Sequence, residues 1–395
     1  MQIMETFLFL YMRINLFDQE QIRQNLLPFT FTRPVADIRI GILTISEKWQ
    51  KRGFEIGFET QDYLSQKFPA TNAEIQVNGA LCPNDELVVA VKSLKPDEQL
   101  MAGDEVLAKY GKGTTAVQFD LPYLIIQQSW DIFLHNAAEI KVDFELITKG
   151  RKSQPITDPH TVVYNQEDVF LEAGVSIKAA VLNAENGPIY LGKNSEVHEG
   201  SHIRGSFALC EGAHVNMGAK IRGDSTIGPF SKVGGEVANS VIFANSSKGH
   251  EGYLGNSVIG EWCNLGADTN TSNLKNNYAQ VKVWDYAKEG FKNTGLQFCG
   301  LMMADHAKCG INTMFNTGTI VGVGANIFGS GFPRNFVPSF SWGGAAGFST
   351  FQIKKFDEVA DAVMKRKSKE YDETEKGIVR EVFNLTDQYR IWDKK

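Results

Sequence analysis

A repeat of six residues constrains this chain more than any other feature of its sequence. Between residues 189 and 236 the third position of every six is a large aliphatic residue: Leu191, Val197, Ile203, Leu209, Val215, Ile221, Ile227 and Val233. Glycine falls at or near the end of many sixes, where the backbone relaxes as the chain turns. A period of six fits neither an amphipathic helix nor one long strand, and it is the signature of a parallel β-helix. Because one coil cannot bury its apolar face alone, many coils must stack.

The repeat extends beyond this run and is interrupted. In-phase aliphatic residues begin at Leu171 and Ile177, and residues 180–188 read as an insertion at a corner. After Val233 the phase is lost until Ile259, and a polar, asparagine-rich excursion follows at 266–298. The hexads resume at Met303, Cys309, Phe315, Val321 and Ile327. A long loop inside a repeat is more often functional than accidental, so we expect the site at this interruption.

The chain of 395 residues is long enough for roughly two or three domains. Strand-like segments alternate with helical ones from residue 14, which predicts an α/β domain. We place this domain at residues 1–150, a linker at 151–168, the β-helix at 169–345 and a helical tail at 346–395. The apolar residues 7–12 read as the beginning of a strand or as an extension upstream of a start at Met12, since their flanks do not fit a signal peptide.

Composition and charge exclude several classes of function. A hydrophobic content of 43% and a net charge of −6 suit a soluble globular protein that binds neither nucleic acid nor membranes. The five cysteines form no CxxC pair, which favours a reducing cytoplasm over a disulfide framework. No pair of residues has metal-ligand spacing, so we expect no metal site. The glycine loops that cradle phosphate are also missing.

Polar residues at the interruption are the first candidates for chemistry. A neutral imidazole accepts a proton near pH 7, so His250 is a candidate general base; the alternative is a histidine that only satisfies a corner of the coil. An asparagine amide or a backbone N–H nearby can stabilise an oxyanion. In the N-terminal domain, Arg33 and Arg39 can grip phosphate through paired hydrogen bonds, and the alternative for each is an ordinary surface ion pair.

Several motifs resemble one enzyme family. The hexads with KGHEGYLG (248–255), NLGA (264–267) and TSN (271–273) resemble the acetyltransferase half of the bifunctional N-acetylglucosamine-1-phosphate uridylyltransferase and glucosamine-1-phosphate acetyltransferase. Residues 14–387 are similar to an alternative, Bacteroidetes-type version of that enzyme, through LPFTFTRP (27–34), GPIYLG (187–192), GEWCNLGADT (260–269), KCGINT (308–313) and SWGG (341–344). The resemblance implies a nucleotidyltransferase-like α/β domain joined to a left-handed parallel β-helix. It also implies a homotrimer, with acetyl-CoA bound between neighbouring subunits.

The resemblance assigns roles to five residues at the interruption. His250 takes the position of the catalytic base. Asn264 and Asn273 take the positions of two asparagines that hold the amino sugar and orient the site. Tyr253 takes that of a tyrosine that helps to hold the sugar phosphate. Ala267 takes that of a small residue whose backbone N–H contacts the acetyl-CoA thioester.

Departures from the family pattern change what is expected of both halves. The basic residues that grip the sugar phosphate have no clear counterpart, and Lys248 or Lys275 is the candidate to substitute for them. The glycine-rich loop of the uridylyltransferase is missing from residues 18–27. Its metal-binding Asp is expected after a glycine at a strand end, where this chain has Asn78, Gly79 and Ala80. We therefore expect Mg²⁺ only if the N-terminal domain catalyses nucleotidyl transfer with other residues.

The sequence predicts a cytoplasmic transferase of nucleotide-sugar synthesis. Its β-helix would acetylate a hexosamine 1-phosphate, and its N-terminal domain, active or degenerate, would form a UDP- or dTDP-sugar from a sugar 1-phosphate and a nucleoside triphosphate. The alternative from another class is a non-catalytic sugar-nucleotide sensor or scaffold. The missing glycine-rich loop favours that alternative for the N-terminal domain.

Overall fold

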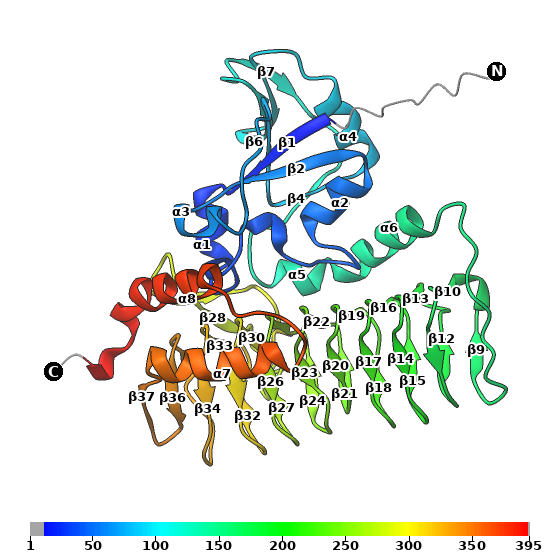
Figure 1. The fold of residues 1–395 in the computed structure, drawn as a ribbon, viewed down its shortest axis with the longest axis vertical. Coiled ribbons are helices and arrows are strands. Elements are labelled where there is room, and N and C mark those ends of the chain that lie inside the picture. The colour runs from blue at the N-terminus through cyan, green and yellow to red at the C-terminus, as the bar shows by residue number, and fades with distance from the viewer. Residues whose placement is uncertain (1–11, 394–395) are drawn as a thin grey trace.

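The computed structural model describes residues 12–393, and its N-terminal part is an α/β domain (Figure 1). Its sheet has the order β2-β1-β3-β6-β5-β7, with β1 between β2 and β3 and parallel to both. The strands are β1 (Met12–Phe17), β2 (Phe54–Glu59), β3 (Ile75–Asn78), β5 (Glu98–Ala102), β6 (Glu105–Tyr110) and β7 (Thr115–Gln118), and a separate pair is β4 (Leu81–Cys82) with β8 (Leu124–Ile125). The predicted extension at residues 7–11 lies outside the described residues.

Local chemistry explains where the helices of this domain begin. They are α1 (Glu20–Asn25), α2 (Ile45–Lys51), α3 (Asp62–Ser65), α4 (Asp85–Lys92), α5 (Asp131–Leu134) and α6 (Asn136–Thr148). The Thr44 hydroxyl accepts the N–H of Glu47, and the Glu47 carboxylate accepts the N–H of Thr44, which is a capping box. Asn84 caps α4 in the same way from its side-chain oxygen.

Helix α6 connects the domain to the β-helix below it (Figure 1). The Lys48 ammonium lies 2.6 Å from Asp143 and 2.8 Å from Glu139, and all three side chains are buried. The second oxygen of Asp143 accepts the N–H of Ile42. Asn136 accepts a hydrogen bond from Thr226 of the β-helix at 3.2 Å. A buried charge is tolerated only when it is paired, so this network fixes loop 41–43 between the two parts.

Residues from Val162 onward form a β-helix with three faces of short parallel strands. The first face is β10 (Val169–Leu171), β13 (Ile189–Leu191), β16 (Phe207–Leu209), β19 (Ser225–Ile227), β22 (Val241–Ile242), β25 (Val258–Ile259), β30 (Met302–Met303), β33 (Ile320–Val321) and β35 (Phe336–Val337). The second face is β11 (Ser176–Ile177), β14 (Glu196–Val197), β17 (His214–Val215), β20 (Lys232–Val233), β23 (Ser247–Lys248), β26 (Asn264–Leu265), β31 (Lys308–Cys309), β34 (Asn326–Ile327) and β36 (Ser341–Gly344). The third face is β9 (Val162–Tyr164), β12 (Val181–Asn183), β15 (His202–Arg204), β18 (Lys220–Ile221), β21 (Glu236–Ala238) and β24 (Tyr253–Gly255), continued by β27 (Asn270–Thr271) and β32 (Met314–Phe315). Strand β9 lies within the predicted linker and pairs with β12.

The interior of the β-helix is built from the predicted hexad positions. All eight aliphatic residues from Leu191 to Val233 are at most 2% exposed. Full burial of one such side chain stabilises the fold by about 1.5–3 kcal/mol, so the stacked coils hold the helix together. The coils also continue where the hexad count fails, because Val237 pairs with Ile221 and Lys248 with Val233. The count fails there because these turns contain fewer residues.

The long excursion leaves the coils without disturbing their stacking. Strand β25 pairs directly with β30, so residues 272–301 form a loop between stacked coils. This loop carries an antiparallel hairpin of β28 (Lys282–Asp285) and β29 (Gly290–Asn293). All five cysteines lie within the described residues and are buried and unpaired.

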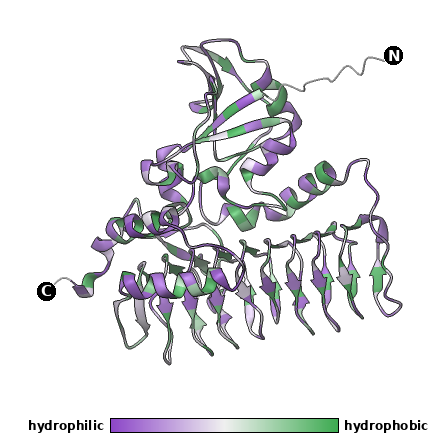
Figure 2. Ribbon diagram, viewed as in Figure 1, coloured by the Kyte–Doolittle hydropathy of each residue, from purple (hydrophilic) through white to green (hydrophobic). Residues whose placement is uncertain are grey.

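The C-terminal tail consists of a strand and two helices. Strand β37 (Gly347–Thr350) closes the second face antiparallel to β36. Helix α7 (Ile353–Lys365) carries hydrophilic and hydrophobic residues along its length (Figure 2). It buries Phe356, Ala360 and Met364, which recur every four residues on one face. Helix α8 (Glu373–Leu385) follows. The predicted fold class, an α/β domain with a left-handed parallel β-helix and a helical tail, is confirmed. Within residues 12–393 no helix has the length and apolar character needed to cross a membrane.

Candidate active site

The corner that follows β23 presents His250 to solvent. Its backbone is held from three sides: Lys248 Nζ donates to the His250 carbonyl at 2.6 Å, and Asn216 donates to the Gly249 carbonyl at 2.8 Å. On the next coil, the Asp268 N–H donates to the Glu251 carbonyl at 3.1 Å. The corner is therefore rigid, while the imidazole itself is exposed.

Tyr253 and Asn273 lie together, as the prediction requires of two residues in one site. The Asn273 amide donates to the Tyr253 phenol oxygen at 3.0 Å and to the side-chain oxygen of Asn256 at 2.7 Å. Burial raises the pKa of Tyr253, so its phenol stays protonated and can donate to a ligand. Asn256 was not predicted. Asn270, whose side-chain oxygen accepts the N–H of Tyr253 at 2.8 Å, belongs to the polar interruption but was given no role of its own. The stacking of successive coils on the third face brings both asparagines next to Tyr253 and Asn273, and this stacking is the feature from which they could have been found.

Glycine at position 252 allows the two corners to stack closely. Its φ is +121°, and a Cβ atom there would lie 2.1 Å from the carbonyl oxygen of Thr269. Only glycine fits both the backbone angle and the space. Ala267 lies at the corner stacked on this one, and its N–H has no protein acceptor among the described residues. That N–H can therefore donate to a ligand.

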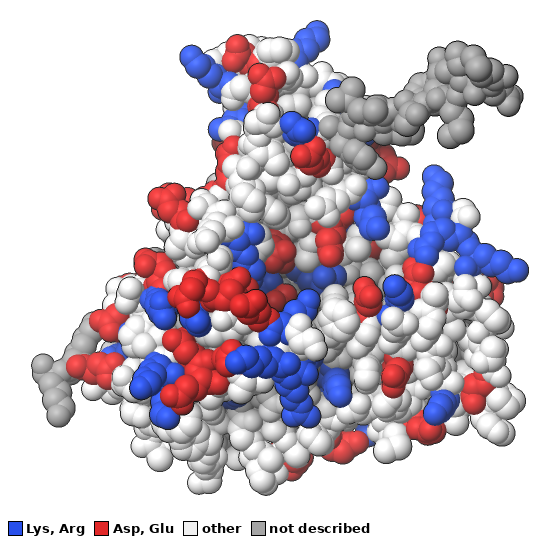
Figure 3. Space-filling model, viewed as in Figure 1, with Lys and Arg blue, Asp and Glu red and all other residues white. Residues whose placement is uncertain are grey.

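Asn264 lies on a different face from Asn273. It is exposed on β26 and lines a groove of about 790 Å³ between the second face and helix α7. The groove contains five cationic side chains and no carboxylate: Lys232, Lys308, Arg366, Lys367 and Lys369. Burial lowers the pKa of both Lys308 and Lys367 to about 8. Charged side chains of both signs crowd the surface over the C-terminal helices (Figure 3). The groove itself suits an anionic ligand.

Lys248 is not available to a sugar phosphate, contrary to the prediction. Its side chain is 2% exposed because it occupies the interior line of the coils, next to Val233. Its ammonium donates to the carbonyl oxygens of Gly234 at 3.0 Å and of His250. Burial lowers the pKa of Lys248 to about 8. The lysine thus supports the His250 corner from inside.

Arg33 is also not available to substrate, contrary to the prediction. It is 4% exposed, and its guanidinium lies 2.5 Å from Asp305, 3.3 Å from Glu261 and 3.2 Å from Asp37. Thr32 donates to the same Asp305 oxygen at 2.7 Å. Asp305 and Glu261 belong to the β-helix, so this arginine joins the two parts of the chain. Arg39, the other phosphate candidate, is 7% exposed and pairs with Glu47.

The carboxyl ends of β1 and β3 do not offer an open set of ligands for Mg²⁺. Asp18 follows β1, and its oxygens accept the Val35 N–H at 2.8 Å and the Thr60 hydroxyl at 2.6 Å. Burial raises the pKa of Asp18. Asn78, at the end of β3, donates to Glu105 and accepts the Ala80 N–H. Helix α1 begins at Glu20, two residues after Asp18, where the family has its glycine-rich loop. These residues do not fit the expected Mg²⁺ site.

Known proteins resemble this chain over parts of its length. Residues 14–152 match the family "Sugar nucleotidyl transferase". The chain is 38% identical over 87 residues to "Bifunctional protein GlmU" of Methanocaldococcus jannaschii, which covers 22% of this chain and 21% of that protein. It is 28% identical over 169 residues to the "Bifunctional sugar-1-phosphate nucleotidylyltransferase/acetyltransferase" of Sulfurisphaera tokodaii, which covers 42% of this chain and 40% of that protein.

These matches cover only part of each relative, between about a fifth and two fifths of its length. A solved polysialic-acid-specific acetyltransferase, NeuO, aligns with 49% of this chain and 83% of its own at 16% identity. Its TM-score of 0.27 is too low to support an argument. Residues 14–152 therefore match the sugar nucleotidyl transferase family, and the chain is similar over part of its length to proteins described as bifunctional sugar-1-phosphate nucleotidylyltransferase/acetyltransferases.

Proposed function

We propose that the β-helix transfers an acetyl group from acetyl-CoA to the amine of a hexosamine 1-phosphate. The observation that carries this proposal is the rigid corner with an exposed His250 immediately before the hydrogen-bonded Tyr253–Asn273 pair. His250 accepts the amine proton as the nitrogen attacks the thioester carbonyl. The Ala267 N–H stabilises the oxyanion that forms there. The C–S bond then breaks, CoA leaves as its thiol, and the N-acetyl sugar phosphate remains.

The basic groove supports acetyl-CoA as the donor. CoA carries a diphosphate and a 3′-phosphate, and five cations line the groove without a carboxylate among them. Asn264 lines the groove and precedes Ala267 by three residues on the same coil, which connects the phosphate-binding surface to the thioester position. The homotrimer, with a neighbouring subunit completing the donor site, stays part of this proposal.

The acceptor position is tested by the KM for glucosamine 1-phosphate. Asn273→Ala should raise this KM by roughly 10- to 100-fold, because a hydrogen bond to a charged or polar ligand is lost in a half-buried cluster. The KM for acetyl-CoA should stay unchanged. Asn277→Ala is the matched control, since Asn277 lies in the same excursion but is exposed, and its side-chain oxygen accepts the N–H of Ala279. Equal KM values in the two variants would exclude Asn273 from the acceptor site.

For the N-terminal domain we propose nucleotidyl transfer to a sugar 1-phosphate, with release of pyrophosphate. The family match over residues 14–152 supports it. A second candidate, a domain that binds sugar nucleotides without turnover, is favoured by one observation. Helix α1 begins where the glycine-rich loop is expected, and Asp18 and Asn78, at the ends of β1 and β3, are already engaged in hydrogen bonds.

Two measurements separate these candidates. Calorimetry with UTP and with dTTP shows whether the full-length protein binds a nucleotide. A pyrophosphate assay with Mg²⁺ and a sugar 1-phosphate then shows turnover, and nucleotidyl transfer predicts release that requires both substrates. Binding without pyrophosphate release, across several sugar phosphates, would instead identify the domain as a sensor.

A further inference from the structure

We propose that Glu196, His198 and His214 bind a divalent transition-metal ion such as Zn²⁺ on the second face of the β-helix. Two imidazoles and one carboxylate are a donor set that zinc uses in proteins, with water in the remaining position. The site lies on coils that precede the His250 corner and has no part in the proposed acetyl transfer. The resemblance assigns no role to these residues.

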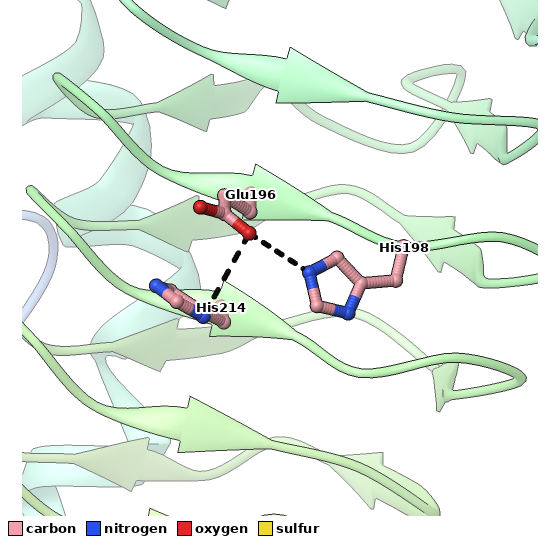
Figure 4. Close-up of side chains that lie close together, drawn as sticks. All are labelled: Glu196, His198 and His214. Carbon is pink, nitrogen blue, oxygen red and sulfur yellow. Dashed lines mark hydrogen bonds and ion pairs between the residues drawn. The ribbon is translucent and has the colours of Figure 1, made fainter.

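The regular stacking of the coils brings the three side chains together (Figure 4). Glu196 of β14 lies directly opposite His214 of β17. Adjacent strands are about 4.8 Å apart, so the two side chains stand side by side. Glu196 and His198 are two residues apart and therefore leave the chain on the same side. Both imidazoles point toward the Glu196 carboxylate.

The distances are close to those of a zinc site. His198 Nε2 lies 2.9 Å from Glu196 Oε2, and His214 Nδ1 lies 4.0 Å from the same oxygen. All three ligand atoms lie within 4.8 Å of one another. Ligands about 2.0–2.1 Å from a tetrahedral zinc lie about 3.4 Å apart, so small side-chain rotations are sufficient. The side chains are 26–44% exposed, which admits the ion and its water ligand.

The protonation states at the site also suit a metal. The hydrogen bond between His198 and Glu196 keeps the pKa of Glu196 below its usual value, so the carboxylate is ionised, and a bound metal ion would displace the proton that the two side chains share. Burial lowers the pKa of His214, so its imidazole is neutral near pH 7 and has a free lone pair. Lys178, Lys232 and Lys367 also face the cluster and oppose a cation. Their repulsion weakens the binding of any divalent cation, whereas the two imidazoles favour transition-metal ions over Mg²⁺ and Ca²⁺, which prefer oxygen ligands.

Calorimetric titration of the untagged full-length protein with Zn²⁺ tests the site. We expect one ion per chain at pH 7.5, no binding of Mg²⁺ there, and weaker binding of Zn²⁺ at pH 5.5, where protons compete for the imidazoles. His198→Asn and His214→Asn should each weaken the affinity for Zn²⁺ by at least ~10-fold. Loss of a residue that only hydrogen-bonds to a metal ligand already costs about that much, so loss of a ligand itself should cost no less. The melting temperatures of both variants without metal should match that of the wild type.

His202→Asn is the matched control, because His202 is an exposed histidine on the third face of the same coil as Glu196 and His198. It should bind Zn²⁺ as the wild type does. Failure of the wild type to bind one ion per chain would overturn the proposal. So would equal affinities in the wild type and both cluster variants, or an equal loss in His202→Asn.

Discussion

The His250→Ala variant is expected to acetylate glucosamine 1-phosphate with a kcat lower than that of the wild type by ~10²–10⁴-fold, the usual contribution of a general base. The imidazole has no hydrogen-bond partner among residues 12–393, and Lys248, Asn216 and Asp268 hold the backbone of its corner. The substitution should therefore leave the fold and the KM for acetyl-CoA unchanged. The measurement is the initial rate of CoA thiol release at saturating concentrations of both substrates.

The control for this prediction is His202→Ala, which removes another exposed histidine of the β-helix. Its kcat should equal that of the wild type. If His250→Ala also kept the wild-type kcat, His250 would be a corner residue without a role in proton transfer. That outcome would support the alternative reading of this histidine and remove the base from the mechanism.

The Arg33→Ala variant is expected to lose about 3–5 kcal/mol of unfolding free energy, which is the usual cost of removing one partner from a buried ion pair. Asp305 is 4% exposed, and within residues 12–393 its carboxylate keeps the Thr32 hydroxyl and the Glu261 N–H but no cationic hydrogen-bond partner when the guanidinium is gone. The loss is large because a buried carboxylate without a counter-ion is poorly solvated. The measurement is urea denaturation followed by tryptophan fluorescence.

The pH dependence of this loss follows from Asp305. Burial tends to raise its pKa, but Arg33, Thr32 and the Glu261 N–H together hold it below the usual 3.8. A depressed pKa in the folded state stabilises the protein above the unfolded pKa, and this stabilisation disappears as the pH falls through the folded value. The difference between the wild type and Arg33→Ala should therefore be full near pH 7 and shrink below pH ~4.

Arg13→Ala provides the comparison with an exposed pair. Arg13 lies 2.8 Å from Glu55, but both side chains are 49% exposed. Removing such a pair typically costs about 0–1 kcal/mol. If Arg33→Ala were no more destabilised than Arg13→Ala, the buried network would not be what joins the two parts of the chain.

The β-helix could be predicted because its cause is local in the sequence. Each hexad places one aliphatic side chain inside, and Leu191 to Val233 repeat this without a break. The His250 corner and the Tyr253–Asn273 pair follow from a motif on adjacent coils. The cluster of Glu196 and His214 also had a signal, because residues three hexads apart lie opposite each other in the stack.

Arg33 and Lys248 could not be placed in the same way. The partner of Arg33 is Asp305, which is distant in the sequence and belongs to another part of the fold. Lys248 occupies an interior position that is apolar in the neighbouring coils. The turns before it are shorter than a hexad requires, so counting in sixes does not identify this position as an interior one. In both cases burial and pairing depend on tertiary structure. The motifs therefore predicted that these two charged residues bind substrate, whereas both side chains are buried and stabilise the fold.

Acetyl transfer at the interrupted coils is tested most directly by identifying the product of the wild-type protein. Full-length protein is incubated with acetyl-CoA and either glucosamine 1-phosphate or glucose 1-phosphate, which lacks the amine, and products are identified by mass spectrometry. We predict N-acetylated sugar phosphate in an amount equal to the CoA released from the amino sugar, and no acetylated product from glucose 1-phosphate. CoA release that is no faster with the amino sugar than with glucose 1-phosphate would contradict the proposed function.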